Sequence, residues 1–261
     1  MPPVITLTTD FGEGSPYVAQ MKGVILSLLP AAAMVDLSHA IPPQDVHQAA
    51  LVLGDVCPRF PPHTIHVVVV DPGVGTEREI LAARIDQQIY LAPDNGLLDI
   101  LWSRHGVGEL VALVDAQYWL PEPSPTFHGR DILAPVAARL AQGVRLDQLG
   151  PPRTQPVRLT WPGVHLEPRK VEGSVLLVDA FGNLITNITR EFLASAPTGA
   201  ELTIRCADHE TRGIVRTYGE RPPRTLLALF GSGGRLELAI AGGHAAATLG
   251  AHVGARVTVT W

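Results

Sequence analysis

The segment from residue 65 to residue 78 constrains the fold of this chain more than any other. Residues 65–70, Ile-His-Val-Val-Val-Val, form a mostly apolar, β-branched run, which is typical of a strand covered on both faces, as in a parallel sheet between helices. Asp71-Pro72-Gly73 follow directly; the proline favours an extended backbone at Asp71, and the glycine permits a sharp turn. Ligands of open α/β sheets bind at the carboxyl ends of the strands, so Asp71 lies where a functional site is expected.

Segments of strand-like and helix-like pattern alternate through residues 1–150, which predicts an α/β fold. The expected strands cover residues 4–9, 34–37, 65–70, 80–85 and 88–92, and the expected helices cover residues 17–29, 45–57, 95–104 and 132–142. The dipeptide Asp86-Gln87 between two of these strands indicates a hairpin. The sheet is therefore expected to be mostly parallel, with an antiparallel pair.

Composition changes after Gly150. Residues 151–170 contain several prolines and are interpreted as a linker, and residues 171–261 contain only short strand candidates. We therefore predict an α/β protein of two domains: an amino-terminal α/β sandwich with a mostly parallel central sheet over residues 1–150, and a smaller, carboxyl-terminal all-β, barrel-like domain over residues 171–261.

Charge and apolar content exclude several classes of function. Of 261 residues, 46% are hydrophobic, and the formal net charge is −5, which does not suit a phosphate-binding surface for nucleic acid. No apolar run reaches the roughly 18 to 20 residues that span a bilayer, and the amino terminus lacks a signal-peptide pattern. Cys57 and Cys206 have no metal-ligand spacing and are expected to be buried thiols. These features predict a cytoplasmic protein without nucleic-acid or membrane partners.

Acidic residues follow three of the expected strands, and a histidine precedes an expected helix. Asp10, Asp71 and Asp94 lie at strand ends, and His128 lies on a loop between a proline-rich stretch and the helix over residues 132–142. Each aspartate alone is equally well explained as a helix cap or an Asx turn. Together the three aspartates favour a site at one edge of the sheet, and His128 is a candidate acid or base beside it.

Two further segments carry polar groups in the expected β domain. Residues 179–187 place Asp179, Phe181 and Asn183 in one strand-turn-strand segment, which suits an adenine-like base because a ring can stack on it and an amide can bind its edge. A simple hairpin with Gly182-Asn183 as its turn explains the same residues. The Gly-Ser-Gly-Gly segment around Ser232 suits a carboxylate bound by backbone N–H groups, or is only a loop.

Several blocks of sequence, in this order, resemble one family over nearly the whole chain. The blocks are residues 9–12 (Thr-Asp-Phe-Gly), 36–39 (Asp-Leu-Ser-His), 70–76 (Val-Asp-Pro-Gly-Val-Gly-Thr), 92–97 (Ala-Pro-Asp-Asn-Gly-Leu), 126–131 (Thr-Phe-His-Gly-Arg-Asp) and 181–187 (Phe-Gly-Asn-Leu-Ile-Thr-Asn). They are similar to the S-adenosyl-L-methionine hydroxide adenosyltransferases, a family related to the fluorinases and chlorinases, which attack the same substrate with halide.

The resemblance implies a reaction, an assembly and roles for individual residues. The reaction is hydrolysis of S-adenosyl-L-methionine to adenosine and L-methionine by substitution at C5′ with water or hydroxide, without a cofactor or a metal. The assembly is a homotrimer with active sites between the amino-terminal domain of one subunit and the carboxyl-terminal domain of the next. The implied roles are water handling for Asp71, Arg78 and His128, ribose binding for Asp10, adenine contact for Phe181 and Asn183, and methionine binding for Asp179 and Ser232. Because neutral histidine is a stronger base than carboxylate, we expect His128 to accept the proton and Asp71 to orient the water.

Departures from the related patterns keep alternatives open. Fluorinases have tyrosine at the position of Asp71 and serine at that of Gly129, and the hydroxide family leads us to expect asparagine at the position of Gly231. The first alternative is a halide-dependent adenosyltransferase that makes 5′-chloro-5′-deoxyadenosine, which Asp71 disfavours because a carboxylate repels an anion. The others are a metal-dependent hydrolase built on Asp10, Asp71, Asp94 and His128, and a non-catalytic adenosine-binding protein.

Overall fold

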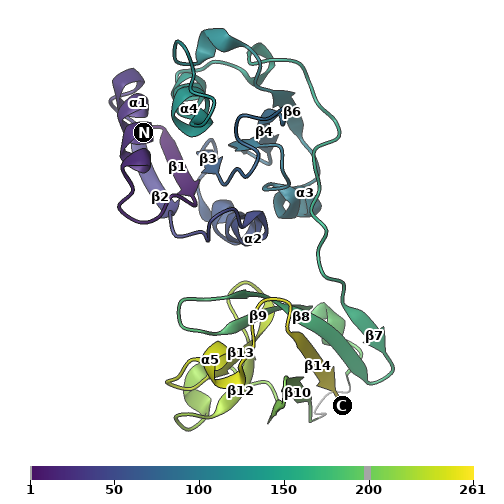
Figure 1. Cartoon of the computed structure of the whole chain (residues 1–261). Coiled ribbons are helices and arrows are strands. Elements are labelled where there is room, and N and C mark those ends of the chain that lie inside the picture. The colour runs from purple at the N-terminus through teal and green to yellow at the C-terminus, as the bar shows by residue number, and fades with distance from the viewer. Residues whose placement is uncertain (1, 197–200) are drawn as a thin grey trace. The chain divides into compact units, whose positions relative to one another are not determined.

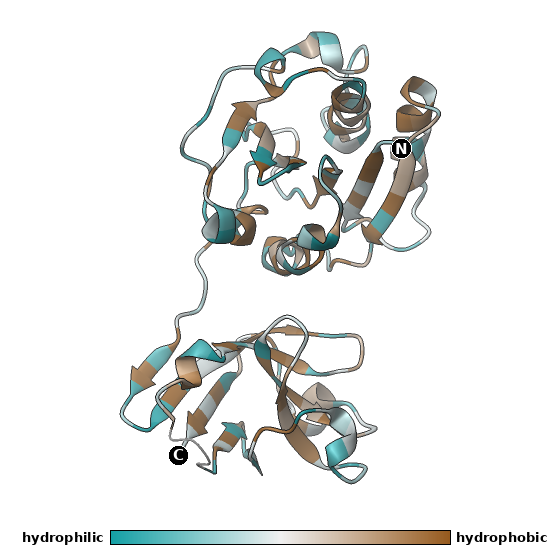
Figure 2. Cartoon of the chain, turned by 180° about the vertical axis from the view of Figure 1, so that it is seen from behind, coloured by the Kyte–Doolittle hydropathy of each residue, from teal (hydrophilic) through white to brown (hydrophobic). Residues whose placement is uncertain are grey.

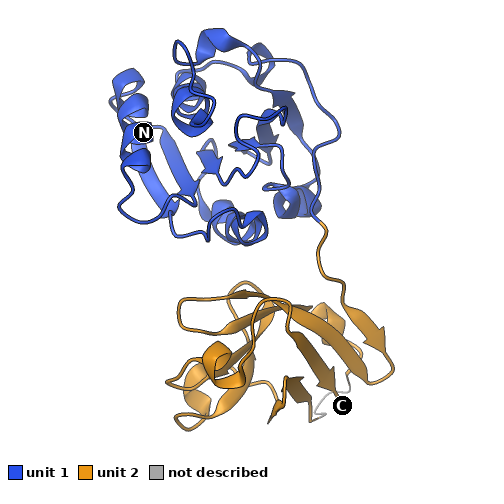
Figure 3. Ribbon diagram, viewed as in Figure 1, with its two compact units in different colours: residues 1–159 blue, residues 160–261 orange. Residues whose placement is uncertain are grey.

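The chain divides into two compact units, residues 1–159 and residues 160–261 (Figure 3). The structure, a computed structural model, describes residues 2–196 and 201–261. The division falls inside the segment expected to be a linker, and this segment also carries the short strand β7 (His165–Glu167), which pairs with β8 (Lys170–Val178).

A six-stranded mixed sheet forms the centre of the first unit (Figure 1). Its strands, in the order in which they lie side by side, are β2 (Ala33–Ser38), β1 (Val4–Thr9), β3 (Ile65–Val69), β5 (Gln88–Pro93), β4 (Ile80–Ile85) and β6 (Glu109–Ala112). The first four strands run parallel, and β4 runs antiparallel to both β5 and β6. The predicted hairpin and the predicted mixed, mostly parallel sheet are confirmed.

Helices cover both faces of this sheet, so the unit is the expected α/β sandwich. The helices are α1 (Pro16–Leu28), α2 (Val46–Val56), α3 (Asp99–His105) and α4 (Ala134–Ala141), and short helical turns cover residues 57–59, 116–118, 129–133 and 146–148. Apolar residues of α1 and α4 share one core with one face of the sheet, and those of α2 and α3 share another with the opposite face. Figure 2 shows hydrophilic and hydrophobic bands along the same helices, as their amphipathic patterns predict.

His66 is a buried titratable residue in the core of this unit. It lies on β3, is fully buried, and its Nδ1 atom is 2.7 Å from Thr6 Oγ1. Its ring stacks on Tyr90, with 4.7 Å between the ring centroids. Burial lowers the pKa of His66 to about 4, because the charged imidazolium is disfavoured away from water.

The depressed pKa of His66 predicts a loss of stability in weak acid. Below the ordinary pKa of about 6.5 the unfolded chain binds the proton more readily than the folded chain does, so the free energy of unfolding decreases as the pH falls toward 4. We expect His66 to account for about 2 kcal/mol of that loss between pH 7 and pH 5. Denaturant unfolding of the wild type and of His66→Phe at both pH values measures it. An equal loss in the variant would contradict the prediction.

The second unit is an antiparallel sheet that curls into a nearly closed barrel. Its strands, in order, are β11 (His209–Arg212), β10 (Thr203–Cys206), β14 (Arg256–Thr260), β8 (Lys170–Val178), β9 (Leu184–Thr189), β13 (Arg235–Ile240) and β12 (Leu226–Phe230), with β7 beside β8. The helix α5 (Ala245–Leu249) and short turns at residues 191–193 and 218–220 complete the unit. The predicted all-β, barrel-like architecture is confirmed, and apolar residues of these strands form a core of their own.

In the parts of the chain that the structure describes, 2–196 and 201–261, no helix has the length and apolar character needed to cross a membrane.

Candidate active site

An arginine joins two of the predicted site residues in the first unit. The Arg78 guanidinium donates to both carboxylate oxygens of Asp71, from Nε at 3.0 Å and 3.0 Å and from Nη2 at 2.5 Å. Nη2 also lies 2.7 Å from His128 Nδ1. The Arg78 and Asp71 side chains are only 11% and 7% exposed, so this is a largely buried, charge-assisted cluster.

The turn after β3 fixes the position of Asp71 and brings it near His128. Val74 N–H donates to the Asp71 carbonyl at 3.2 Å, and Thr76 N–H donates to the Gly73 carbonyl at 3.1 Å. Gly75 has φ of +78°, and a Cβ atom there would lie 2.6 Å from the Pro125 carbonyl oxygen. Only glycine therefore permits both this backbone conformation and the close approach of the loop that leads to His128.

The hydrogen bond from Arg78 determines where neutral His128 carries its proton. A guanidinium can only donate, so Nδ1 is the acceptor and the neutral ring is protonated at Nε2. Burial and the neighbouring Arg78 charge lower the pKa of His128, and the carboxylates of Asp71 and Asp131 partly oppose this shift. Burial and the Arg78 charge therefore both favour the neutral form of His128. Before Nδ1 can accept a proton, its hydrogen bond from Arg78 must be replaced by a hydrogen bond from the group that gives up the proton.

A cavity of about 200 Å³ adjoins the cluster and is lined by Asp71, His128, Asp10 and Gln44 together with aromatic residues. Asp10 follows β1, and its Oδ2 atom accepts a hydrogen bond of 2.8 Å from Gln44 N–H. The aromatic wall consists of Phe11 and Phe127, whose ring centroids are 5.8 Å apart. The structure thus gathers Asp10, Asp71 and His128 around one cavity, at the carboxyl edge of the parallel strands.

Asp94, the third strand-end aspartate, makes a different contact. Its Oδ1 atom accepts a hydrogen bond of 2.9 Å from Val157 N–H, and burial raises its pKa. Asp94 does not line the cavity beside Asp71, so the structure supports its interpretation as a structural turn residue. Within residues 2–196 and 201–261, no group of three His, Cys, Asp or Glu side chains is arranged to hold a metal ion.

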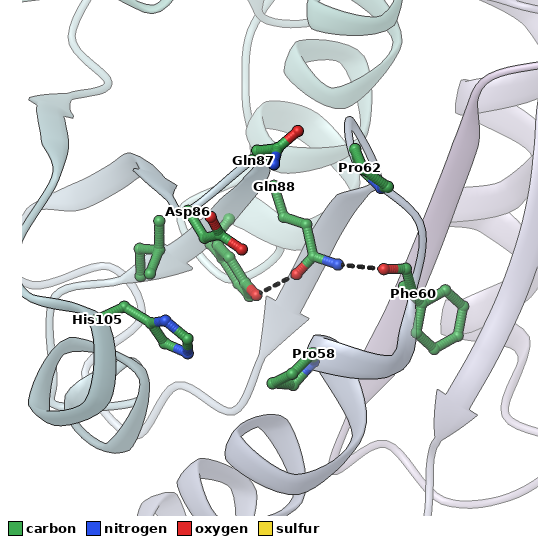
Figure 4. A pocket seen from close by; sticks show the side chains of 9 residues that line it. Pro58, Phe60, Pro62, Asp86, Gln87, Gln88 and His105 are labelled. Carbon is green, nitrogen blue, oxygen red and sulfur yellow. Dashed lines mark hydrogen bonds between the residues drawn. The ribbon is translucent and has the colours of Figure 1, made fainter.

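A second cavity of the first unit, also about 200 Å³, lies at the β4–β5 turn, at the opposite edge of the sheet (Figure 4). Gln88 and Tyr90 line it, and their polar atoms are paired within the protein. Gln88 Nε2 donates to the carbonyls of Cys57 and Phe60 at 3.0 Å and 2.8 Å, and Tyr90 Oη donates to Gln88 Oε1 at 2.7 Å. These pairs hold the start of β5 against the helical turn that follows α2.

The second unit contains a larger cavity, of about 600 Å³. The four residues predicted for the adenine and methionine groups, Asp179, Phe181, Asn183 and Ser232, all line it. Asp179 closes the β8–β9 turn by accepting from Phe181 N–H at 2.9 Å and from Asn183 N–H and Nδ2 at 2.8 Å and 2.9 Å. Phe181 is 77% exposed, so its ring is presented to solvent instead of the core. The segment is both the hairpin turn and a cavity wall.

Two residues that the sequence did not indicate also line this cavity. Tyr218 follows β11 in a short helical turn, and Glu237 lies on β13. The Tyr218 hydroxyl donates to Glu237 Oε2 at 3.0 Å. No sequence motif distinguishes either residue. Glu237, for example, occupies a polar position in the alternating pattern of a strand.

Both units match models of one family. Residues 5–150 match the SAM hydroxide adenosyltransferase N-terminal domain, and residues 173–258 match the corresponding C-terminal domain. An α/β sandwich with a polar cluster at the carboxyl edge of its sheet, followed by a β-barrel unit, is thus the architecture of an adenosyltransferase-type protein. The chain belongs to the SAM hydroxide adenosyltransferase family, as its sequence blocks predicted.

Individual relatives agree with this assignment. The chain is 40% identical to the (R)-S-adenosyl-L-methionine hydrolase of Salinispora arenicola, over 99% of this chain and 98% of that protein. It is 38% identical to the enzyme of the same name from Thermus thermophilus, over 96% of each chain, and 32% identical to the fluorinase of an Actinoplanes species, over 78% and 77%. The crystal structure of an uncharacterized conserved protein from Thermotoga maritima superposes with a TM-score of 0.92 and 35% identity, over 98% of this chain and 100% of that chain.

Proposed function

We propose that this protein hydrolyses S-adenosyl-L-methionine to adenosine and L-methionine. The observation that carries the proposal is the Asp71–Arg78–His128 cluster beside a cavity, in a chain that is 33–40% identical to proteins named (R)-S-adenosyl-L-methionine hydrolase. Aspartate at position 71 also favours water over halide as the nucleophile, because a carboxylate beside the line of attack repels an anion.

The chemistry of the substrate explains why such a cluster is useful. The sulfonium withdraws electrons from C5′, and the methionine thioether leaves as a neutral group, so the leaving group needs no acid. Water becomes a good nucleophile only as it loses a proton, which requires a base and an orienting group. We propose that the water displaces the hydrogen bond of Arg78 to His128 Nδ1, that Asp71 orients it, and that His128 accepts its proton as the oxygen bonds to C5′ and the C5′–S bond breaks. Arg78 stabilises the developing hydroxide by its permanent charge.

The remaining predicted residues serve substrate binding in this proposal. The Asp10 carboxylate lies at the cavity of the first unit and accepts hydrogen bonds from the ribose hydroxyls. In the cavity of the second unit, the exposed Phe181 ring stacks on adenine, and Asn183 binds the adenine edge. Asp179 and Ser232 bind the methionine end. The scheme uses no cofactor and no metal ion.

One measurement tests the activity directly. Incubation of the protein with S-adenosyl-L-methionine, followed by chromatography, should give adenosine and free methionine in equal amounts. Formation of 5′-chloro-5′-deoxyadenosine in the presence of chloride would instead identify a halide-dependent adenosyltransferase. Tight adenosine binding without methionine release would identify a binding protein, and activity that is lost with a chelator and restored by one divalent ion would identify a metal-dependent hydrolase.

We further propose that the protein acts on this small molecule in the cytoplasm. We propose that it does so as a homotrimer, in which each active site combines the first unit of one subunit with the second unit of the next.

Such a site predicts complementation between two inactive variants, Asp71→Asn in the first unit and Phe181→Ala in the second. When both are co-expressed, random assortment leaves about a quarter of the sites with neither substitution. Co-expressed protein that is no more active than either variant alone, or a monomer in light scattering, would contradict this assembly.

A further inference from the structure

The turn after β5, residues 94–97, joins the elements that carry Asp71 and Arg78. In the sheet, β5 lies between β3, which leads into Asp71, and β4, which follows Arg78. Because β5 runs parallel to β3 and antiparallel to β4, its end meets the end of β3 and the start of β4. Residues 94–97 therefore lie beside the two segments that present the ion pair of the proposed mechanism.

On the β3 side, the Asn95 side chain fixes the peptide bond that leads into Asp71. Asn95 Nδ2 donates to the Val70 carbonyl at 2.9 Å. Val70 is fully buried, and the regular pairing of β3 with β5 ends earlier, at Val67, so this carbonyl needs a donor from outside the ladder. Val74 N–H donates to the Asp71 carbonyl, and the peptide groups on both sides of Asp71 are thus held in place.

On the β4 side, the same turn holds the residue that follows Arg78. Asp94 N–H donates to the Glu79 carbonyl at 2.9 Å. The Glu79 carboxylate accepts a hydrogen bond of 2.7 Å from Arg153 Nε and a second one from Arg153 Nη2. The backbone beside Arg78 is therefore fixed by the turn and by a segment from the end of the first unit.

This segment, residues 153–159, also packs against the turn itself. Val157 N–H donates to Asp94 Oδ1 at 2.9 Å. Gly96 has φ of +97°, and a Cβ atom there would lie 2.6 Å from the Leu159 side chain. Glycine at position 96 therefore permits both the left-handed backbone and the close approach of Leu159.

We propose that Asn95 is a positioning residue for the reaction, which holds the Asp71 carboxylate toward Arg78, and that residues 153–159 stabilise the turn that carries it. Asn95 does not line the cavity beside Asp71, so it acts through the backbone of Asp71 instead of touching a substrate there. The inference rests on the proposed function, because the carboxylate that Asn95 positions is the group that orients the water.

The test is Asn95→Ala, which removes the donor to the Val70 carbonyl but no charge. We expect kcat to fall by about 10- to 100-fold, because misplacing a reacting group by about 1 Å can cost about 100-fold, with KM within about 2-fold of the wild type. NMR titration gives a readout that does not depend on turnover. The Asp71 charge raises the pKa of His128, so displacement of Asp71 should lower that pKa.

The matched control is Gln88→Ala, which removes another side-chain amide that donates to backbone carbonyls of the first unit, at the opposite edge of the sheet. It should lower the denaturation midpoint, as Asn95→Ala does, but leave kcat and the pKa of His128 unchanged. A folded Asn95→Ala protein whose kcat and His128 pKa match those of the wild type would overturn the inference, because Asn95 would then have only a structural role.

A second variant tests the link to residues 153–159. Asp94→Ala removes the acceptor of Val157 N–H and leaves Asn95 in place, so kcat and the pKa of His128 should change in the same direction as in Asn95→Ala, but by less. The double variant should be no worse than Asn95→Ala alone, whereas additive losses would contradict this link. A wild type that binds S-adenosyl-L-methionine without cleaving it would refute the proposed function, and the His128 titrations would still decide the role of Asn95.

Discussion

Replacing His128 by asparagine is expected to lower kcat by about 100- to 10,000-fold, the usual contribution of proton transfer by a positioned base, with little change in KM. Asparagine is the informative replacement because its Oδ1 atom takes nearly the position of Nδ1. It can therefore accept the hydrogen bond that Arg78 now donates to His128, but it cannot accept a proton from water. Steady-state kinetics of adenosine release measure both constants, and a kcat effect without a KM effect indicates an interaction made only in the transition state.

The same variant separates two roles for His128. If His128 only holds Arg78 in place, asparagine should preserve that hydrogen bond and most of the activity. His105→Asn is the matched control, because it makes the same exchange at an exposed residue at the end of α3 and should leave kcat unchanged. Activity of His128→Asn within about 10-fold of the wild type would show that another group takes the proton.

The fold was largely predictable because each element has a clear pattern of its own. The apolar run at residues 65–70 corresponds to β3, and the pair at residues 80–85 and 88–92 corresponds to the β4–β5 hairpin. Helix ends differed by a few residues. The helix predicted over 132–142 is preceded by a wider π-type turn over residues 129–133 and becomes an α-helix only at Ala134, a change of hydrogen bonding that apolar spacing does not reveal.

The candidate site was predictable where it follows from sheet topology. Asp10 and Asp71 end neighbouring parallel strands, whose register pairs Thr9 with Val69, so their proximity follows from the βαβ order alone. Asp94 ends the next strand but is engaged by Val157 N–H, a contact from a segment without regular pattern. The identification of Arg78 came from the family resemblance, since no local pattern distinguishes it from other arginines.

Glu237 could not be predicted, for a physical reason. Its place depends on a space, the absent side chain of Gly231, and on a bond from Tyr218, nineteen residues away along the chain. Neither a space nor a pairing between distant turns leaves a periodic signal. Sequence patterns therefore located most strands of the second unit, whereas the pairing of the side chains that line its cavity required the structure.

Removing either charged partner of His128 is expected to abolish most activity and to move the pKa of His128 in opposite directions. The Arg78 charge lowers that pKa, and the Asp71 charge raises it. Arg78→Gln should therefore raise the pKa of His128, and Asp71→Asn should lower it further. NMR titration of the His128 ring measures both shifts without relying on residual activity, and Arg78→Lys, which keeps the charge, should move the pKa least.

The ion pair between Arg78 and Asp71 should also contribute to stability. Arg78→Gln leaves the Asp71 carboxylate, only 7% exposed, without its cation, and breaking a buried pair in this way typically costs about 3–5 kcal/mol. The double variant Asp71→Asn/Arg78→Gln removes both charges and should recover much of that loss. Denaturant unfolding of the wild type, Arg78→Gln and the double variant therefore separates the effect of the unpaired charge from that of lost packing.

The kcat/KM of the wild-type enzyme should decrease only as the pH falls below the ordinary histidine range, because neutral His128 is the active form. Shifts of the same sign in Arg78→Gln and Asp71→Asn would show that His128 does not interact with both of these charges in solution, and the water-activating cluster would then need a different base.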